Sequence, residues 1–131
     1  MKTIVIIISV LAVMTVVYGY NEERSEKFLR NLSKCEKSPT RLQGDRLSLE
    51  TVICAIENDG KIFNENGEYK FEAAMQGLED AISDQNSLNK AKKTFTNCYN
   101  KEIEKKTTGM DQTKEITKCS LSIFSFFDKL K

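Results

Sequence analysis

From residue 20 onward, apolar residues recur every three or four positions, which is the period of an α-helix. No stretch alternates strictly between apolar and polar residues, as a half-buried strand would. Turn residues interrupt the pattern at Ser38-Pro39-Thr40, at Asn58-Asp59-Gly60 and at Thr107-Thr108-Gly109, and Asp45 is placed to cap the second helix. The expected helices cover residues 22–37, 46–58, 71–83, 87–106 and 111–130. The pattern therefore predicts an all-α domain of five amphipathic helices.

The segment 61–69, KIFNENGEY, has no clear helical pattern. Asn66-Gly67 between short apolar runs is typical of a β-hairpin turn. The alternative, which we favour, is a structured loop with Ile62 and Phe63 in the core. A calcium loop is excluded, because with Gly67 in the sixth place the first and twelfth ligands would be Ile62 and Ala73.

The first nineteen residues have the pattern of a secretory signal peptide. Lys2 supplies the positive start, residues 4–17 are almost entirely apolar, and Val17-Tyr18-Gly19 places small residues at a cleavage site after Gly19. A membrane anchor is the alternative, but the run is shorter than the roughly 20 residues that a spanning helix needs. We expect a signal peptide at 1–19, a secreted, extracellular domain at 20–131 and no stable membrane insertion.

Composition excludes several classes of function. The chain has 131 residues, with 20 Lys and Arg against 19 Asp and Glu, so it lacks the basic surplus typical of nucleic-acid binding. Histidine is absent, which removes Ser-His-Asp triads and His-based zinc sites. The carboxylates form no recognisable acid–base pair. We expect no enzyme, no catalytic residue, no metal, no cofactor and no nucleic-acid partner.

The four cysteines, Cys35, Cys54, Cys98 and Cys119, are an even number in a small secreted domain, which predicts two disulfides. Four cysteines allow three pairings, and the sequence alone does not choose between them. A four-thiolate zinc site is a poorer interpretation, because no two cysteines have the close C-x₂₋₄-C spacing.

The stretch ETVICAIENDGKI at residues 50–62, followed by NGEY at 66–69, resembles the middle of insect odorant-binding proteins. The 43 residues between Cys54 and Cys98 and the 20 between Cys98 and Cys119 agree with that family, and the missing second and fifth cysteines resemble its four-cysteine "C-minus" subgroup. The resemblance implies an all-α fold, a compact disulfide-linked bundle of five to six amphipathic helices around an apolar cavity. It also implies the pairs Cys35–Cys54 and Cys98–Cys119, a small hydrophobic ligand, and a chemosensory receptor or a second copy as partner. Only 18 residues separate Cys35 from Cys54, a span short by about one helix, which leaves open whether the pocket is closed on that side.

The segment 120–127, SLSIFSFF, is apolar around more than half of a helix and must be covered on as many sides. A central core helix is the favoured interpretation, with cavity lining or a partner contact as alternatives. Tyr99 could offer a hydroxyl to a ligand, although a surface-pointing hydroxyl is commoner. The expected ligand-binding residues are Val52, Ile56, Phe71, Met75, Phe95, Tyr99, Phe124 and Phe127. None is cationic, so no fixed ion pair with a ligand carboxylate is expected.

Three hypotheses of function follow. The first, placed ahead chiefly by the resemblance, is a secreted carrier of small hydrophobic molecules such as odorants, pheromones or fatty-acid-like ligands. The second is a secreted helical effector, as in venom or saliva, that acts on a protein target; it predicts a packed interior and an exposed apolar patch, as on the final helix. The third is a hydrolase with two convergent carboxylates.

Asn31-Leu32-Ser33 is a glycosylation sequon, but Asn31 falls on the stripe expected to be buried.

Overall fold

The computed structural model describes residues 19–37 and 42–131. Within these ranges the chain is all-helical, as expected, and forms no strand. None of the described helices is long and apolar enough to cross a membrane. The expected signal peptide, apart from Gly19, and the Ser38-Pro39-Thr40 break lie outside the described residues. The elements are α2 (Glu22–Cys35), α3 (Leu49–Asp59), α4 (Phe71–Ala81), α5 (Gln85–Lys105), α6 (Gly109–Cys119) and two short 3₁₀ helices, η2 (Leu121–Phe126) and η3 (Asp128–Leu130).

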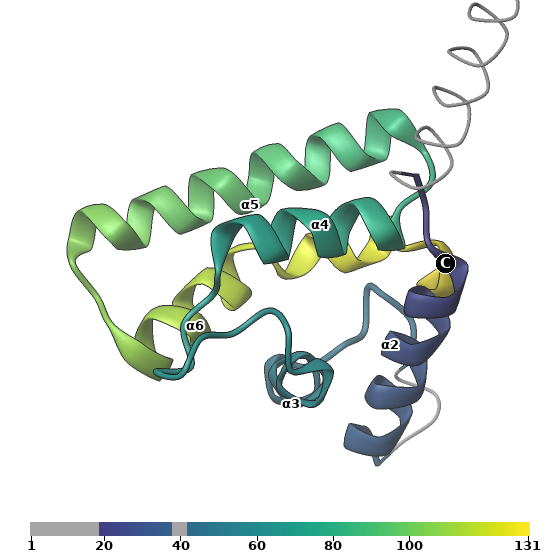
Figure 1. Cartoon of the computed structure of the whole chain (residues 1–131), viewed down its shortest axis with the longest axis horizontal. Coiled ribbons are helices and arrows are strands. Elements are labelled where there is room, and N and C mark those ends of the chain that lie inside the picture. The colour runs from purple at the N-terminus through teal and green to yellow at the C-terminus, as the bar shows by residue number, and fades with distance from the viewer. Residues whose placement is uncertain (1–18, 38–41) are drawn as a thin grey trace, which may run out of the picture.

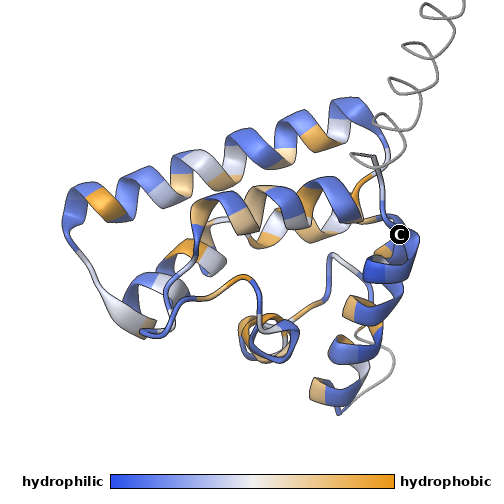
Figure 2. Ribbon diagram, viewed as in Figure 1, coloured by the Kyte–Doolittle hydropathy of each residue, from blue (hydrophilic) through white to orange (hydrophobic). Residues whose placement is uncertain are grey.

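The helices surround one hydrophobic core. α4 lies alongside the long α5, and α2 packs against α3 (Figure 1). The C-terminal segment, which comprises η2 and η3, runs behind α4 (Figure 1). The outer faces of α2 and α5 are largely hydrophilic, as expected of amphipathic helices that turn their apolar stripes inward (Figure 2). The core contains Leu32 of α2, Val52 of α3, Leu78 of α4, Phe95 of α5 and Ile116 of α6, all at most 5% exposed.

Local capping explains where the helices begin and end. The expectation that Asp45 caps the second helix is wrong, because α3 begins at Leu49 and its cap is Ser48, whose Oγ accepts the Thr51 N–H at 3.2 Å. Gly60 ends α3 in the left-handed conformation, with φ of 75°. Asp84 caps α5 by accepting the Ser87 N–H at 2.8 Å, and that bond holds the pKa of Asp84 below its ordinary value.

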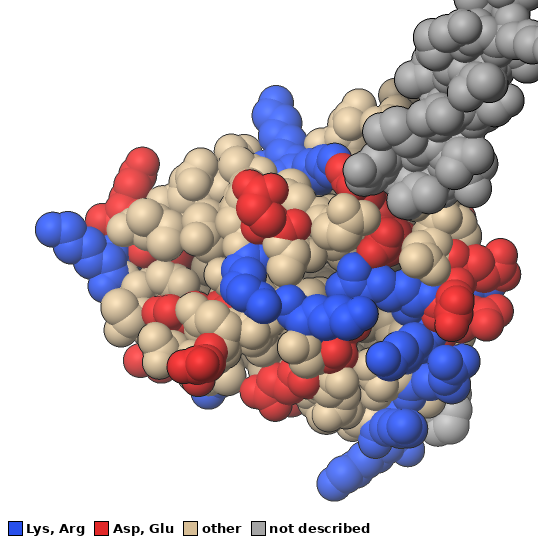
Figure 3. All heavy atoms as spheres, viewed as in Figure 1, with Lys and Arg blue, Asp and Glu red and all other residues tan. Residues whose placement is uncertain are grey.

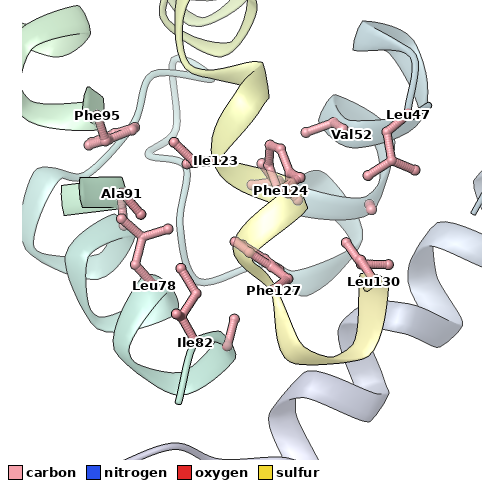
Figure 4. Packing of buried hydrophobic residues seen from close by; sticks show 14 of the residues in the cluster. Leu47, Val52, Leu78, Ile82, Ala91, Phe95, Ile123, Phe124, Phe127 and Leu130 are labelled. Carbon is pink, nitrogen blue, oxygen red and sulfur yellow. The ribbon is translucent and has the colours of Figure 1, made fainter. Parts of the chain in front are cut away.

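The expected single helix over 111–130 is also wrong, because α6 ends at Cys119 and the chain continues as η2 and η3. At the break, the Ser120 hydroxyl donates to the Ile116 carbonyl at 2.7 Å, a back-bond that competes with regular helix geometry. The tighter turns let the segment pass between α3 and α4 and bury Ile123, Phe124, Phe127 and Leu130 in the core (Figure 4). The segment is central, as favoured, but not as a regular helix.

The segment 61–69 combines features of both alternatives. It is a structured loop whose Ile62 and Phe63 pack against the core, and it also closes one antiparallel bridge between Phe63 and Tyr69. Glu68 fastens this loop to the start of α6, because its carboxylate accepts the Gly109 N–H at 2.8 Å and the Asn64 amide at 3.0 Å. The Gly109 bond is the main reason that the pKa of Glu68 lies below its ordinary value.

Two disulfides cross-link the bundle. Cys35–Cys54 joins α2 to α3 and Cys98–Cys119 joins α5 to α6, with Cα–Cα distances of 6.0 and 5.8 Å. This is the pairing that the resemblance implied. All four cysteines are oxidised, so no thiolate is available for zinc.

Candidate functional site

An apolar pocket lies between α2, α3, α4 and the C-terminal segment. It is a cavity of about 60 Å³ that is partly open to solvent. Most of its wall is hydrocarbon, and three charged side chains join the lining from the ends of the helices. The main apolar contributors are Phe28, Ile56, Leu78, Ile123, Phe124 and Phe127, and the charged ones are Arg24, Asp59 and Asp80.

One side of the pocket is a cluster of three rings, Phe28, Phe124 and Phe127, which we call the C-terminal ring cluster. The Phe124 and Phe127 centroids are 4.8 Å apart, and Phe28 reaches them from α2 with centroid distances of 6.2 and 5.8 Å. These contacts join the first described helix to the end of the chain. The cluster therefore closes the pocket with residues nearly one hundred positions apart in sequence.

A second group of rings, which we call the aromatic wall, consists of Phe63, Tyr69, Phe71, Phe95 and Tyr99. Tyr69 and Phe95 line the pocket and meet edge to face at 5.1 Å. The Tyr69 hydroxyl is hydrogen-bonded to the Thr117 hydroxyl at 2.8 Å, and burial raises the pKa of Tyr69 to about 12. Tyr69 is therefore neutral at physiological pH, with its hydroxyl already engaged.

A charged rim crosses the pocket where α2, α3 and α4 meet. The Arg24 guanidinium donates to Asp80 Oδ2 at 2.5 Å and lies 3.4 Å from Asp59 Oδ2, so one cation serves two carboxylates. Gln76 donates to the other Asp80 oxygen at 3.1 Å. The rim side chains are mostly buried, with exposures of 21% for Arg24, 7% for Asp59 and 9% for Asp80. This burial removes much of the solvent screening that weakens surface ion pairs.

The structure brings together half of the expected ligand-binding residues. Ile56, Phe95, Phe124 and Phe127 line the pocket, whereas Val52, Phe71, Met75 and Tyr99 do not. Val52 is fully buried in the core, and Met75 packs against the core from a partly buried position. The Phe71 and Tyr99 rings lie 5.1 Å apart, and both contact the ring of Phe95, which lines the pocket. Ligand binding by any of the eight residues stays a prediction.

Sequence reasoning missed the charged rim and Tyr69. Arg24 lines the pocket although none of the eight expected residues is cationic, and the absence of a fixed ion pair with a ligand carboxylate stays a prediction. One signal was present: Arg24 lies four residues before Phe28 and therefore on the same face of α2. Its partners are 35 and 56 positions away along the chain, at the ends of other helices, and no local pattern identifies them.

The surface of the described part of the chain exposes few large hydrophobic side chains. Among the described large hydrophobic residues only Ile103 is exposed, at 47%, so the apolar patch expected of a protein-directed effector is not found on the final segment. Lys and Arg alternate with Asp and Glu over the face seen in Figure 3. Asn31 of the sequon is 6% exposed, and its side-chain nitrogen has no hydrogen-bond partner in the described structure.

Comparison with known proteins identifies the family. The family model of the ant venom allergen Sol i 2 family matches residues 34–124 of the 131-residue chain. No curated protein and no solved structure matches the chain.

The match corrects the resemblance to insect odorant-binding proteins, which is wrong. The residues that carried the resemblance form the end of α3, its Gly60 cap and the turn at Gly67, where φ is 80°. Such helix-stop and turn residues recur in many helical domains, as do pairs of disulfides in small secreted ones. The chain belongs to the ant venom allergen Sol i 2 family.

Proposed function

We propose that this protein is a secreted venom-type protein whose interior binds one compact apolar molecule. Membership in a venom-allergen family and two disulfides, which persist in oxidising compartments, support the secreted venom role. Residues 1–19 are the proposed signal peptide, and 20–131 the mature domain.

The pocket supports the second half of the proposal. A concave, mostly apolar cavity with a few convergent polar groups is the usual form of a small-molecule site. The cavity of about 60 Å³ has room for about four or five water-sized spheres, which favours a compact molecule over a long chain. The proposal is therefore narrower than a carrier of fatty-acid-like ligands.

The test is a titration of the oxidised mature chain, residues 20–131, with alcohols of different length, monitored by the NMR shifts of the backbone amides. We expect isobutanol to shift amides around the pocket, such as those of Ile56, Leu78 and Phe124, and to saturate with a Kd of about a millimolar or weaker, as its few atoms allow. Decanol should produce no saturable shift at these positions. Phe127→Ala, which enlarges the cavity, should admit hexanol. An interior that no alcohol perturbs would contradict the proposal.

A second candidate function is action on a protein of the recipient, meaning the animal into which the venom is delivered. The family match supports this hypothesis better than it supports general transport of apolar molecules, because it connects the chain with a venom allergen and not with a known carrier. Its test is saturable binding of labelled mature protein to recipient cells. Competition by excess unlabelled protein and loss of binding after the cell surface is treated with protease would support it, and non-saturable binding would contradict it.

A further inference from the structure

The polar end of the pocket carries a net negative charge. Arg24 contributes one positive charge and Asp59 and Asp80 one negative charge each, which leaves minus one in a largely buried position. Asp80 is well satisfied, since Arg24 bonds to one carboxylate oxygen at 2.5 Å and Gln76 to the other at 3.1 Å.

Asp59 is not satisfied in the same way. Its side chain is 7% exposed, yet its Oδ2 has only two long contacts, to Arg24 at 3.4 Å and to the Lys61 N–H at 3.3 Å. No described residue donates a hydrogen bond to its Oδ1. This oxygen is not sealed off from solvent, since among the described side chains the buried atom without a partner is Asn31 Nδ2 and not Asp59 Oδ1. Because Asp59 lines the cavity, a bound molecule can donate a hydrogen bond to this accessible oxygen in place of water.

We infer that the pocket takes a compact apolar molecule bearing one protonated amine, whose ammonium donates to Asp59 Oδ1. This inference rests on the proposed small-molecule function of the pocket. The hydrocarbon part lies against the C-terminal ring cluster and Leu78, and the Arg24–Asp80 pair stays in place. A ligand carboxylate would meet the net negative charge and be disfavoured, whereas a neutral alcohol would gain a hydrogen bond without charge assistance.

Three molecules with the same carbon skeleton test the inference: isobutylamine, isobutanol and isobutyrate. Alkylamines are protonated at pH 7. By NMR titration of the oxidised mature chain, we expect the amine to bind about tenfold or more tighter than the alcohol, as a charge-assisted hydrogen bond allows, and isobutyrate to bind most weakly. The amine should shift the Asp59 and Arg24 signals most.

A variant locates the effect. Asp59→Asn should reduce the affinity for the amine to that for the alcohol and leave the alcohol within about twofold of its original affinity. Asp111→Asn, which removes one charge at an exposed position outside the pocket, should change neither affinity. If Asp59→Asn fails to fold, the comparison of the three molecules on the unmodified chain still tests the inference.

The outcomes separate the two proposals. An alcohol or an acid that binds as tightly as the amine overturns the inference while leaving a small-molecule pocket. No binding by any of the three overturns both the inference and the proposed pocket function. An amine preference that persists in a folded Asp59→Asn variant overturns the assignment to Asp59.

Discussion

The aromatic wall and the C-terminal ring cluster face the same pocket but are held in different ways. Around the aromatic wall, the Cys98–Cys119 disulfide joins α5 to α6 and Tyr69 is hydrogen-bonded to the buried Thr117. No disulfide joins η2 or η3 to the rest of the described structure. The C-terminal segment is held by packing, by the Gly44 N–H bond to the Leu130 carbonyl at 3.0 Å, by the exposed Lys129–Glu22 pair at 2.9 Å, and by Asp128, which accepts the Ser83 N–H at 3.0 Å and the Ser83 hydroxyl at 2.5 Å.

The difference indicates which side of the pocket adapts to a ligand. Local opening needs less free energy where no covalent link holds a segment, and the C-terminal segment, although its apolar side chains are buried, has no disulfide. Exposed ion pairs such as Lys129–Glu22 contribute about 1 kcal/mol at most. We therefore expect the C-terminal ring cluster to move when a molecule enters and the aromatic wall to stay fixed.

The largest expected effect comes from breaking the aromatic wall at its centre. Phe95 is 3% exposed and contacts the rings of Tyr69, Phe71 and Tyr99, so Phe95→Ala should lower the free energy of unfolding by about 3–5 kcal/mol. Urea denaturation measures the change. Ile103→Ala on the exposed face of the same helix is the control and should change it by less than about 0.5 kcal/mol. Similar losses from both variants would contradict the central role of Phe95.

A second variant displaces the C-terminal ring cluster. A Cβ at Gly44 would collide with the backbone of Phe124, and no side-chain movement relieves that contact. Gly44→Ala should therefore displace the C-terminal segment and lower the free energy of unfolding by about 1–3 kcal/mol. Hydrogen exchange should accelerate at Phe127 and Leu130 but not at Phe95. Equal acceleration at both places would mean that the two ring groups unfold as one unit.

How far the sequence predicts this molecule depends on the range of each interaction. Helix periods and stops such as Gly60 are local, so the all-α class and most helix positions were predictable. The break at Ser120 was not, because it depends on how η2 fits between α3 and α4. The charged rim was not predictable either, since Arg24, Asp59 and Asp80 belong to three helices, and the family depended on a whole-domain pattern that short motifs did not carry.

A smaller effect is expected from the buried hydroxyl of the aromatic wall. Tyr69→Phe removes the bond to Thr117, whose own hydroxyl still donates to the Thr113 carbonyl at 2.7 Å, so the loss should be about 1 kcal/mol. Burial, and not this bond, raises the folded-state pKa of Tyr69 to about 12, above the ordinary value of 10, so the stability that depends on a neutral Tyr69 is complete below pH 10 and is lost as the pH rises toward 12. Unfolding measured from pH 8 to pH 12 should show that decline in the unmodified chain, and Tyr69→Phe should remove its share. An identical decline in both would contradict the assignment to Tyr69.

The smallest effect has the opposite sign and acts on the pocket itself. Gly77 lies inside α4 and lines the cavity, and an added Cβ would sit 3.4 Å from Ile62 Cδ1, an ordinary contact. Gly77→Ala should stabilise the fold by about 0.5–1 kcal/mol, because alanine loses less conformational freedom than glycine in a helix. The same methyl group takes space from the cavity, so isobutanol should bind more weakly to the more stable protein. Thermal unfolding and the NMR titration measure the two changes on one sample. Tighter binding with higher stability would mean that the alcohol enters on the side of the C-terminal ring cluster without using the space beside α4.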